Sequence, residues 1–276
     1  MKKVFFICLL ILIQNNLYAQ YNFKKVIIVT LENTNYKNAN AQPFIASLIK
    51  KGTLFTNFYA ETHPSQGNYI AMTSGDLMGV KNDKNVYIDT KHIGDLLETE
   101  GLSWKVYAEG YPGNCFLENS GNYVRKHNPF ISYKNIYENL DRCNNHIRNA
   151  DELEIDIINN QVPNYSFYVP DLKNDGHDTG IAYADKWLQK KFGPILENPD
   201  IMKDMLFILT FDESGFSPKN QISTIFIGDS VKINYKSNLF YNHYSILKTL
   251  ESAWNLGSLD KNDVSAKEIL DAFIEI

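Results

Sequence analysis

Four short runs of apolar residues interrupt the chain, and each of them stops abruptly at polar or turn-forming residues. The runs are residues 25–31, 165–169, 205–211 and 223–227, followed by Glu32-Asn33, Pro170-Asp171, Asp212-Glu213 and Gly228-Asp229. A continuous apolar run of this length is typical of a strand that is buried on both faces, as in a parallel sheet. Weaker runs at residues 104–107 and 54–59 predict two more strands.

Amphipathic patterns lie between these runs and predict helices at residues 43–51, 92–100, 182–192 and 244–254. Another helix is predicted to begin near Asn68. Strands that alternate with helices indicate an α/β fold, a single doubly wound domain with a mostly parallel central sheet. Residues 109–149, rich in Asn, Tyr and Gly, are the least regular part and predict a long insertion over the functional site.

The N-terminal segment has the features of a signal peptide. It begins with Lys2 and Lys3, continues as an apolar run over residues 4–13, and ends in the small residue Ala19. The apolar run is roughly half as long as a helix that crosses a bilayer. We therefore predict cleavage near Ala19, a folded domain at residues 20–276, no stable membrane insertion, and a periplasmic or extracellular location.

Charge and cysteine content narrow the possible partners. Removing Lys2 and Lys3 with the signal peptide takes the formal net charge from −5 to −7, and an acidic chain without clusters of cations argues against nucleic acid as a partner. Cys8 leaves with the signal peptide, so Cys115 and Cys143 remain. In an oxidising compartment they form either a disulfide or two buried free thiols.

Carboxylates follow three of the predicted strands, at Glu32, at Asp171 and at Asp212-Glu213. One such acid alone is an ordinary helix cap or loop residue. In an open parallel sheet, however, the carboxyl ends of the strands lie along one edge, where ligands bind. Carboxylates crowded together are costly unless a cation lies between them, so a hard divalent metal is the economical explanation.

The segment at residues 61–75 places a hydroxyl at the start of a helix. Ser65 stands where the free N–H groups and the positive end of the helix dipole favour a phosphate. A plain helix cap is the alternative role for this serine. A nucleophilic serine needs activation, which a metal can supply.

Titratable residues also gather in the loop at residues 170–178 and at the start of the last predicted helix. Asp171, Asp175, His177 and Asp178 crowd the loop directly after a strand, and His243 opens the late helix. Solvated loop residues and a core or capping histidine are one interpretation. A second metal or a contact with phosphate is the other.

Taken together, these segments resemble the phosphoesterase family of bacterial secreted acid phosphatases and phospholipase C-type enzymes, within the alkaline phosphatase superfamily. The resemblance spans about residues 24–255. Its motifs, in order, are Leu31-Glu32-Asn33, residues 63–69 (HPSQGNY) with Ser74-Gly75, the loop from Pro170-Asp171 to His177-Asp178, residues 210–213 (TFDE), and residues 242–245 (NHYS). Gly67 departs from the pattern, which has proline there.

The resemblance implies an alkaline phosphatase-like fold and assigns roles to these residues. Glu32, Asn33, Asp212 and Glu213 would surround a divalent metal (Mg, Ca, Mn or Zn). Ser65 would be the nucleophile, with Thr62 as a competitor because it precedes Pro64 by two residues. Asp171, His177 and His243 match, in order, the second-metal ligands of the superfamily, and His177 could instead touch phosphate.

The resulting hypothesis is an exported, metal-dependent hydrolase of small phosphomonoesters. Ser65 attacks phosphorus, Asn33 and the helix N-terminus hold the phosphoryl oxygens, and water hydrolyses the phosphoserine with help from His177. A phospholipase C-type phosphodiesterase of the same fold is the first alternative. A non-catalytic, exported metal-binding protein is the second.

Overall fold

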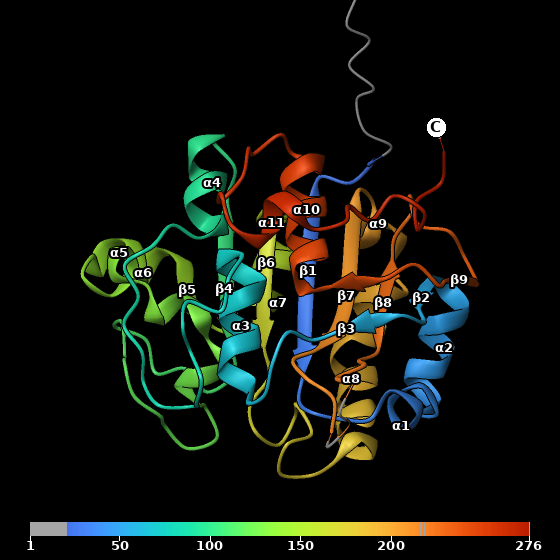
Figure 1. Cartoon of the computed structure of the whole chain (residues 1–276), viewed down its shortest axis with the longest axis horizontal. Helices are drawn as coiled ribbons and strands as arrows, with labels where there is room; N and C mark the ends of the chain where they lie inside the picture. The colour runs from blue at the N-terminus through green and yellow to red at the C-terminus, as the bar shows by residue number, and fades with distance from the viewer. Residues whose placement is uncertain (1–20, 216, 218, 276) are drawn as a thin grey trace, which may run out of the picture.

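An eight-stranded sheet runs through the middle of the molecule (Figure 1). The computed structural model describes residues 21–215, 217 and 219–275, so the predicted signal peptide lies outside the described residues. The order across the sheet is β5 (Ile147–Asn149), β4 (Trp104–Ala108), β6 (Tyr165–Val169), β1 (Lys25–Leu31), β7 (Met205–Phe211), β8 (Thr224–Ile227), β2 (Thr53–Phe55) and β9 (Tyr235–Ser237). A second, two-stranded sheet pairs β3 (Phe58–Tyr59) with β10 (Tyr241–Asn242).

The central strands are those that the apolar runs predict. β1 pairs in parallel with β6 on one side and with β7 on the other. Every residue of β6 and β7 is buried, which explains why their sequences carry no alternation of polar and apolar positions. The predicted bounds of these three strands are confirmed.

Helices cover both faces of the sheet. The connections through α2 (Pro43–Lys51) and α8 (Ile181–Leu196) lead along the sheet towards its β9 side. The connection through α3 (Ser65–Ser74) leads back towards its β5 side. Because crossovers between parallel strands are right-handed, the two directions place these helices on opposite faces. α3 packs against α10 (His243–Ala253) in front of the sheet in Figure 1, and α2 packs against α8. The predicted doubly wound fold is confirmed.

The remaining helices are short. They are α1 (Tyr36–Asn40), α4 (Ile93–Thr99), α5 (Lys134–Tyr137), α6 (Leu140–His146), α7 (Glu152–Ile158), α9 (Pro199–Met202) and α11 (Asn262–Ser265), with two 3-10 helices, η1 (Arg125–His127) and η2 (Pro129–Ser132). Among the described residues, no helix is both long enough and apolar enough to span a bilayer.

One predicted strand runs in the opposite direction to its neighbours. β8 is antiparallel to both β7 and β2, although its apolar sequence suggested another parallel strand. The physical reason is the connection: the described residues between Asp212 and Ser223 form no crossover helix, which a parallel pair requires, and the chain returns directly from β7. Gly228-Asp229, at the end of β8, therefore lie at the opposite edge of the sheet from Asp212-Glu213.

The run at residues 54–59 is not one strand. It divides into β2 and β3, which belong to different sheets, with polar Thr56 and Asn57 at the bend. The bend allows Phe55 and Phe58 both to be buried, with their rings 5.9 Å apart. The prediction of a single strand was wrong, because burying Phe55 and Phe58 on both sides of the bend stabilises the fold more than continuous strand hydrogen bonding would.

Residues 109–149 are more regular than the sequence suggests. They contain two 3-10 helices, α5, α6 and the edge strand β5, and a disulfide joins Cys115 to Cys143. This segment therefore extends the sheet at one side. Its 3-10 helix η1 lies near the carboxyl ends of the central strands.

Candidate active site

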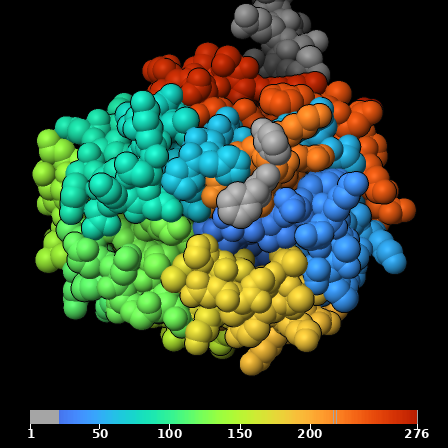
Figure 2. Space-filling view, turned by 60° about the horizontal axis from the view of Figure 1, so that its bottom comes forward, coloured from blue at the N-terminus to red at the C-terminus, as the bar shows by residue number. Residues whose placement is uncertain are grey.

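The site forms where β1 and β7 end side by side. The two strands pair in register along their whole length, from Lys25 opposite Met205 to Leu31 opposite Phe211. The ladder continues one step further, because the Asp212 N–H donates to the Leu31 carbonyl at 3.0 Å. This register places the residues after each strand beside each other. Figure 2 looks onto this edge, where segments far apart in the sequence meet.

Ser65 is brought to the same place by the loop that precedes α3. The serine is buried, and its Oγ lies 3.3 Å from Glu213 Oε1 and 3.5 Å from Glu32 Oε2. The loop is fixed by Asn68, whose side-chain oxygen accepts the N–H groups of Glu61 and Thr62. The Ser65 hydroxyl therefore points at the carboxylates instead of capping its own helix.

Thr62 faces differently from Ser65. Its Oγ1 donates to the neighbouring His63 carbonyl at 3.1 Å. His63 in turn places Nδ1 against Glu213 Oε2. The side chain of Asn33 completes this group, with Nδ2 3.4 Å from Glu213 Oε1.

The carboxylates at this edge lack enough hydrogen-bond donors. Asp212 is fully buried, and neither of its oxygens has a hydrogen-bond partner within the described residues. Burial, and then the charges of Glu32 and Glu213, raise the pKa of Asp212 well above its ordinary value. Burial also raises the pKa of Glu213, while His63 opposes that shift. Crowded, orphaned carboxylate oxygens of this kind fit a bound cation.

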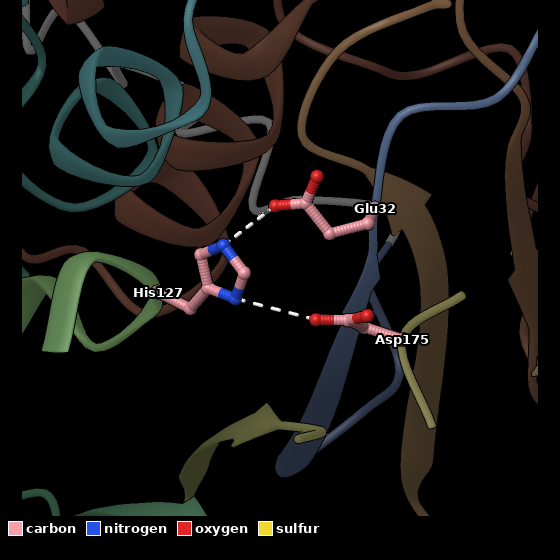
Figure 3. A group of neighbouring side chains, drawn as sticks. All are labelled: Glu32, His127 and Asp175. Carbon is pink, nitrogen blue, oxygen red and sulfur yellow. Dashed lines mark ion pairs between the residues drawn. The ribbon is translucent and has the colours of Figure 1, made fainter. Parts of the chain in front are cut away.

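A histidine that the sequence analysis did not single out lies between two of the acids (Figure 3). His127, on η1, places Nε2 2.6 Å from Glu32 Oε1 and Nδ1 3.3 Å from Asp175 Oδ2. All three side chains are buried, and the ring of His127 stacks on Tyr69 with centroids 4.9 Å apart. The close atoms are not aligned as hydrogen bonds, so the contact is one of charge and proximity.

The charges of these three groups are strongly linked. Burial would raise the pKa of Glu32, but the charge and contact of His127, together with Lys126 and the Asn33 N–H, lower it to about 2. Burial would lower the pKa of His127, but Glu32 and Asp175 raise it to about 9. Burial raises the pKa of Asp175 in spite of His127.

Two overlapping sets of ligand atoms could hold a metal, and both include Glu32. The first is the predicted set of Glu32, Asn33, Asp212 and Glu213 around Ser65. The second is Glu32, His127 and Asp175, which each offer a ligand atom within 4.8 Å of the others. The oxygen donors suit Mg, Ca or Mn, and an imidazole ligand also suits Zn.

The other predicted residues lie elsewhere. Asp171 Oδ1 accepts the N–H groups of Lys173 and Asn174, so this carboxylate shapes its own loop, and Asp175 occupies the place near Glu32 that Asp171 was expected to take. His177 is partly exposed and pairs with Asp178 at 2.8 Å.

His243 is buried at the start of α10. Its Nε2 lies 3.0 Å from the carbonyl of Phe211, the residue before Asp212, and its backbone N–H donates to Glu61. Burial lowers the pKa of His243 to about 4. These contacts make His243 a support for the end of β7, since they leave its ring against the backbone.

A cleft of about 820 Å³ opens beside the carboxylates. Its walls come from the end of β1, α1, the His63-Pro64 turn, the start of α8 and the loop after β7. The lining residues are Asn33, Thr34, Asn35, Asn38, His63, Pro64, Ile181, Glu213, Ser214, Gly215 and Ser217. A small polar molecule in this cleft would lie next to Glu213 and Asn33.

Comparisons with known proteins identify the family of this chain. The chain matches the Phosphoesterase family over residues 14–257. It is 38% identical to a probable acid phosphatase from Kluyveromyces lactis, over 88% of this chain and 61% of that protein. It is 36% identical to an acid phosphatase from Aspergillus fumigatus, over 88% of this chain and 58% of that protein. The chain thus spans about three fifths of the length of these fungal relatives. The expected likeness was to bacterial acid phosphatases, whereas these come from fungi.

A bacterial relative is similar over more of its length. The chain is 31% identical to a phosphatidylinositol-3-phosphatase from Mycobacterium tuberculosis, over 85% of this chain and 78% of that protein. Among solved structures, a protein of the alkaline phosphatase superfamily from Vibrio parahaemolyticus aligns with a TM-score of 0.61, 14% identity and coverage of 89% and 71% of the two chains. The lipoteichoic acid synthase LtaP from Listeria monocytogenes aligns with a TM-score of 0.62, 14% identity and coverage of 91% of this chain and 76% of that chain. The chain belongs to the Phosphoesterase family and has the fold of the alkaline phosphatase superfamily.

Proposed function

We propose that this protein is a metal-dependent phosphomonoesterase with Ser65 as its nucleophile. The observation that carries the proposal is the buried Ser65 hydroxyl, which lies at the first residue of α3 and within 3.5 Å of both Glu32 and Glu213. Its relatives are named acid phosphatases and a phosphatidylinositol-3-phosphatase, which supports the same reaction class.

The residues at the site suit this chemistry. Glu32, Asn33, Asp212 and Glu213 would hold a divalent cation, with His127 and Asp175 beside them. When bound, such a cation neutralises the carboxylates and favours the ionised form of a nearby hydroxyl. The orphaned oxygens of Asp212 are the feature of the chain that fits this role.

The reaction would then proceed by double displacement. The Ser65 hydroxyl gives up its proton and its oxygen forms a bond to phosphorus while the bond to the leaving alkoxide breaks, and the alkoxide takes up a proton to become the alcohol. The Asn33 amide and the N–H groups at the start of α3 hold phosphoryl oxygens. Water then cleaves the phosphoserine, releases phosphate and restores the hydroxyl.

The leaving group would occupy the cleft next to Glu213. His63 is the imidazole that lines this cleft, so we assign to His63 the acid–base role that was expected of His177 in hydrolysis of the phosphoserine. Small, hydroxylated leaving groups suit the neutral amides of Asn35 and Asn38 on the same wall.

Export is a second part of the proposal. It is supported by the signal-like sequence at residues 1–19 and by the disulfide between Cys115 and Cys143, a bond typical of oxidising compartments. N-terminal sequencing of the protein from its host should begin at or near Gln20. A mature chain that starts at Met1 would refute export.

A direct assay tests the reaction class. With a divalent ion present, the purified protein should release phosphate from p-nitrophenyl phosphate much faster than it cleaves bis-p-nitrophenyl phosphate. Preference for the diester would instead support the phospholipase C-type alternative. Absence of turnover on both, across Mg, Ca, Mn and Zn, would leave the protein as a metal-binding protein and refute the proposal.

A further inference from the structure

A carboxylate from another loop lies on the N-terminus of α3. Asp83 accepts the backbone N–H of Gln66 on Oδ1, at 3.1 Å, and Gln66 directly follows Ser65. The other oxygen, Oδ2, lies 3.0 Å from the ammonium of Lys126. The Asp83 carboxylate therefore binds both the Gln66 N–H group and the Lys126 ammonium next to the proposed nucleophile.

Lys126 is tied to the inner site as well as to Asp83. It immediately precedes His127, and its side chain is only 18% exposed. His127 in turn lies 2.6 Å from Glu32 Oε1, so η1 holds Lys126 next to the residue that contacts the buried carboxylates. The ammonium therefore lies between this group and Asp83 at the start of α3.

A purely structural role explains only part of this arrangement. The N-cap position of α3 is Pro64, whose side chain cannot accept a hydrogen bond, so Asp83 can serve as a cap from a distance. Capping accounts for the bond to Gln66. It does not account for a half-buried cation held beside the Ser65 end of the helix, since an ion pair of the surface kind contributes little to stability.

We propose that Lys126 binds the phosphoryl group of the substrate, and that Asp83 occupies the same N–H group and ammonium until the substrate displaces it. The inference rests on the proposed function, because it concerns the same site. A carboxylate and a phosphoryl group present similar oxygens to N–H and ammonium donors, so one can replace the other. Asp83 acts as an internal competitor that keeps Lys126 in position in the free enzyme.

The proposal predicts opposite effects for its two residues. Inorganic phosphate is the probe, and its binding to the metal-loaded protein is measured by calorimetry and as competitive inhibition of p-nitrophenyl phosphate turnover. Lys126→Met removes a charged donor and should weaken phosphate binding about 10- to 100-fold. Asp83→Asn keeps the shape but removes the competing charge, and should tighten phosphate binding about two- to fivefold.

A second ion pair provides the matched control. Lys134 and Asp89 also lie 3.0 Å apart, on the surface of the protein. Lys134→Met and Asp89→Asn should leave phosphate affinity unchanged. Lys126→Arg keeps the charge and should restore most of the affinity lost in Lys126→Met, which separates binding from any loss of folded protein.

Two results would overturn the inference. One is an Asp83→Asn variant with a lower melting temperature and no gain in phosphate affinity, because Asp83 would then be a cap alone. The other is a folded Lys126→Met variant that binds phosphate like the wild type. Direct binding needs no turnover: if the wild-type protein binds phosphate through Lys126 but hydrolyses no ester, the proposed function fails and this inference stands.

Discussion

Two groups of buried carboxylates lie at opposite ends of α3. At the Ser65 end, Glu32, Asp212 and Glu213 surround the serine hydroxyl. At the Gly75 end, Asp263 lies against the helix terminus, where a Cβ on Gly75 would be 2.7 Å from its Oδ1, and Glu251 lies close by on α10. Both groups place acids in the protein interior, yet they are stabilised in different ways.

The Gly75 end needs no cation. Asp263 accepts the N–H groups of Leu259 and Lys261, each at 2.8 Å, so both of its carboxyl oxygens have backbone donors. Burial, and then the charge of Asp263, raise the pKa of Glu251 to about 8, so this second acid is largely protonated at neutral pH.

At the Ser65 end, Asp212 has no such donors in the described part of the chain, and the nearby basic side chains come from the turn before α3 (His63) and from η1 (Lys126 and His127). The difference teaches that burial of acids is not by itself a sign of a metal site. Asp212 and Glu251 both have unpartnered oxygens and a raised pKa, so the stronger sign is the crowding of three acids around one buried hydroxyl, which the Gly75 end lacks.

The largest effect expected from this comparison is on catalysis at the Ser65 end. Ser65→Ala removes the hydroxyl between the carboxylates and should lower the turnover of p-nitrophenyl phosphate by on the order of 10³-fold or more, while phosphate still binds. As a change at the start of a helix alone, it would cost about 1 kcal/mol of stability and little activity. Thr62→Ala is the matched control, and it should lose activity only modestly because its hydroxyl bonds to a backbone carbonyl.

Acid quenching should trap phosphate on the peptide that contains Ser65. Near-native turnover in Ser65→Ala, together with inactive Thr62→Ala, would transfer the role of nucleophile to Thr62. If neither substitution affects hydrolysis, double displacement is wrong for this protein.

The next largest effect is expected from metal removal, which should affect the acids at the Ser65 end of α3 and not those at the Gly75 end. Chelation should abolish turnover, and adding a divalent ion back at about 100 times its Kd should stabilise the fold by about 2.7 kcal/mol, or roughly 5–10 °C in Tm. Asp212→Asn should lose most of this response, because it removes an orphaned carboxylate. Glu251→Gln is the control and should keep it. Full activity in protein verified as metal-free would contradict the assignment of the Ser65 end as a metal site.

Much of the fold could be predicted because its central strands are buried on both faces. The apolar runs of β1, β6 and β7 leave no doubt about their bounds, and the polar residues that follow β1 and β7 mark the edge where Glu32, Asp212 and Glu213 meet. The direction of β8 was harder, because the same apolar composition suits either direction and only the length and content of a connection decide between them.

The part of the site that the sequence did not predict depends on tertiary contacts between loops. His127 belongs to a segment without periodicity, and nothing local distinguishes it from the other histidines; only the packing of η1 against α3 brings it between Glu32 and Asp175. The loop after β6 shows the same limit: Asp171 directly follows the strand, but Gly176 and the turn at residues 171–175 place Asp175, four residues later, beside Glu32.

The smallest effect concerns stability at the Gly75 end. The pKa of Glu251 is about 8 in the folded protein against an ordinary value of 4.5, so the folded state binds this proton more tightly than the unfolded state. The stability due to that proton is fully present below about pH 4.5 and is lost as the pH rises towards 8. Glu251→Gln has no proton to lose, so its advantage over the wild type should grow between pH 5 and 8 and then level off, at a size on the order of 1–3 kcal/mol. Urea unfolding at a series of pH values measures this difference, with exposed Glu100→Gln as the control that should show no such trend. A difference between Glu251→Gln and the wild type that is constant with pH would show that Glu251 is ionised in the folded protein, and the contrast between the two ends of α3 would then fail.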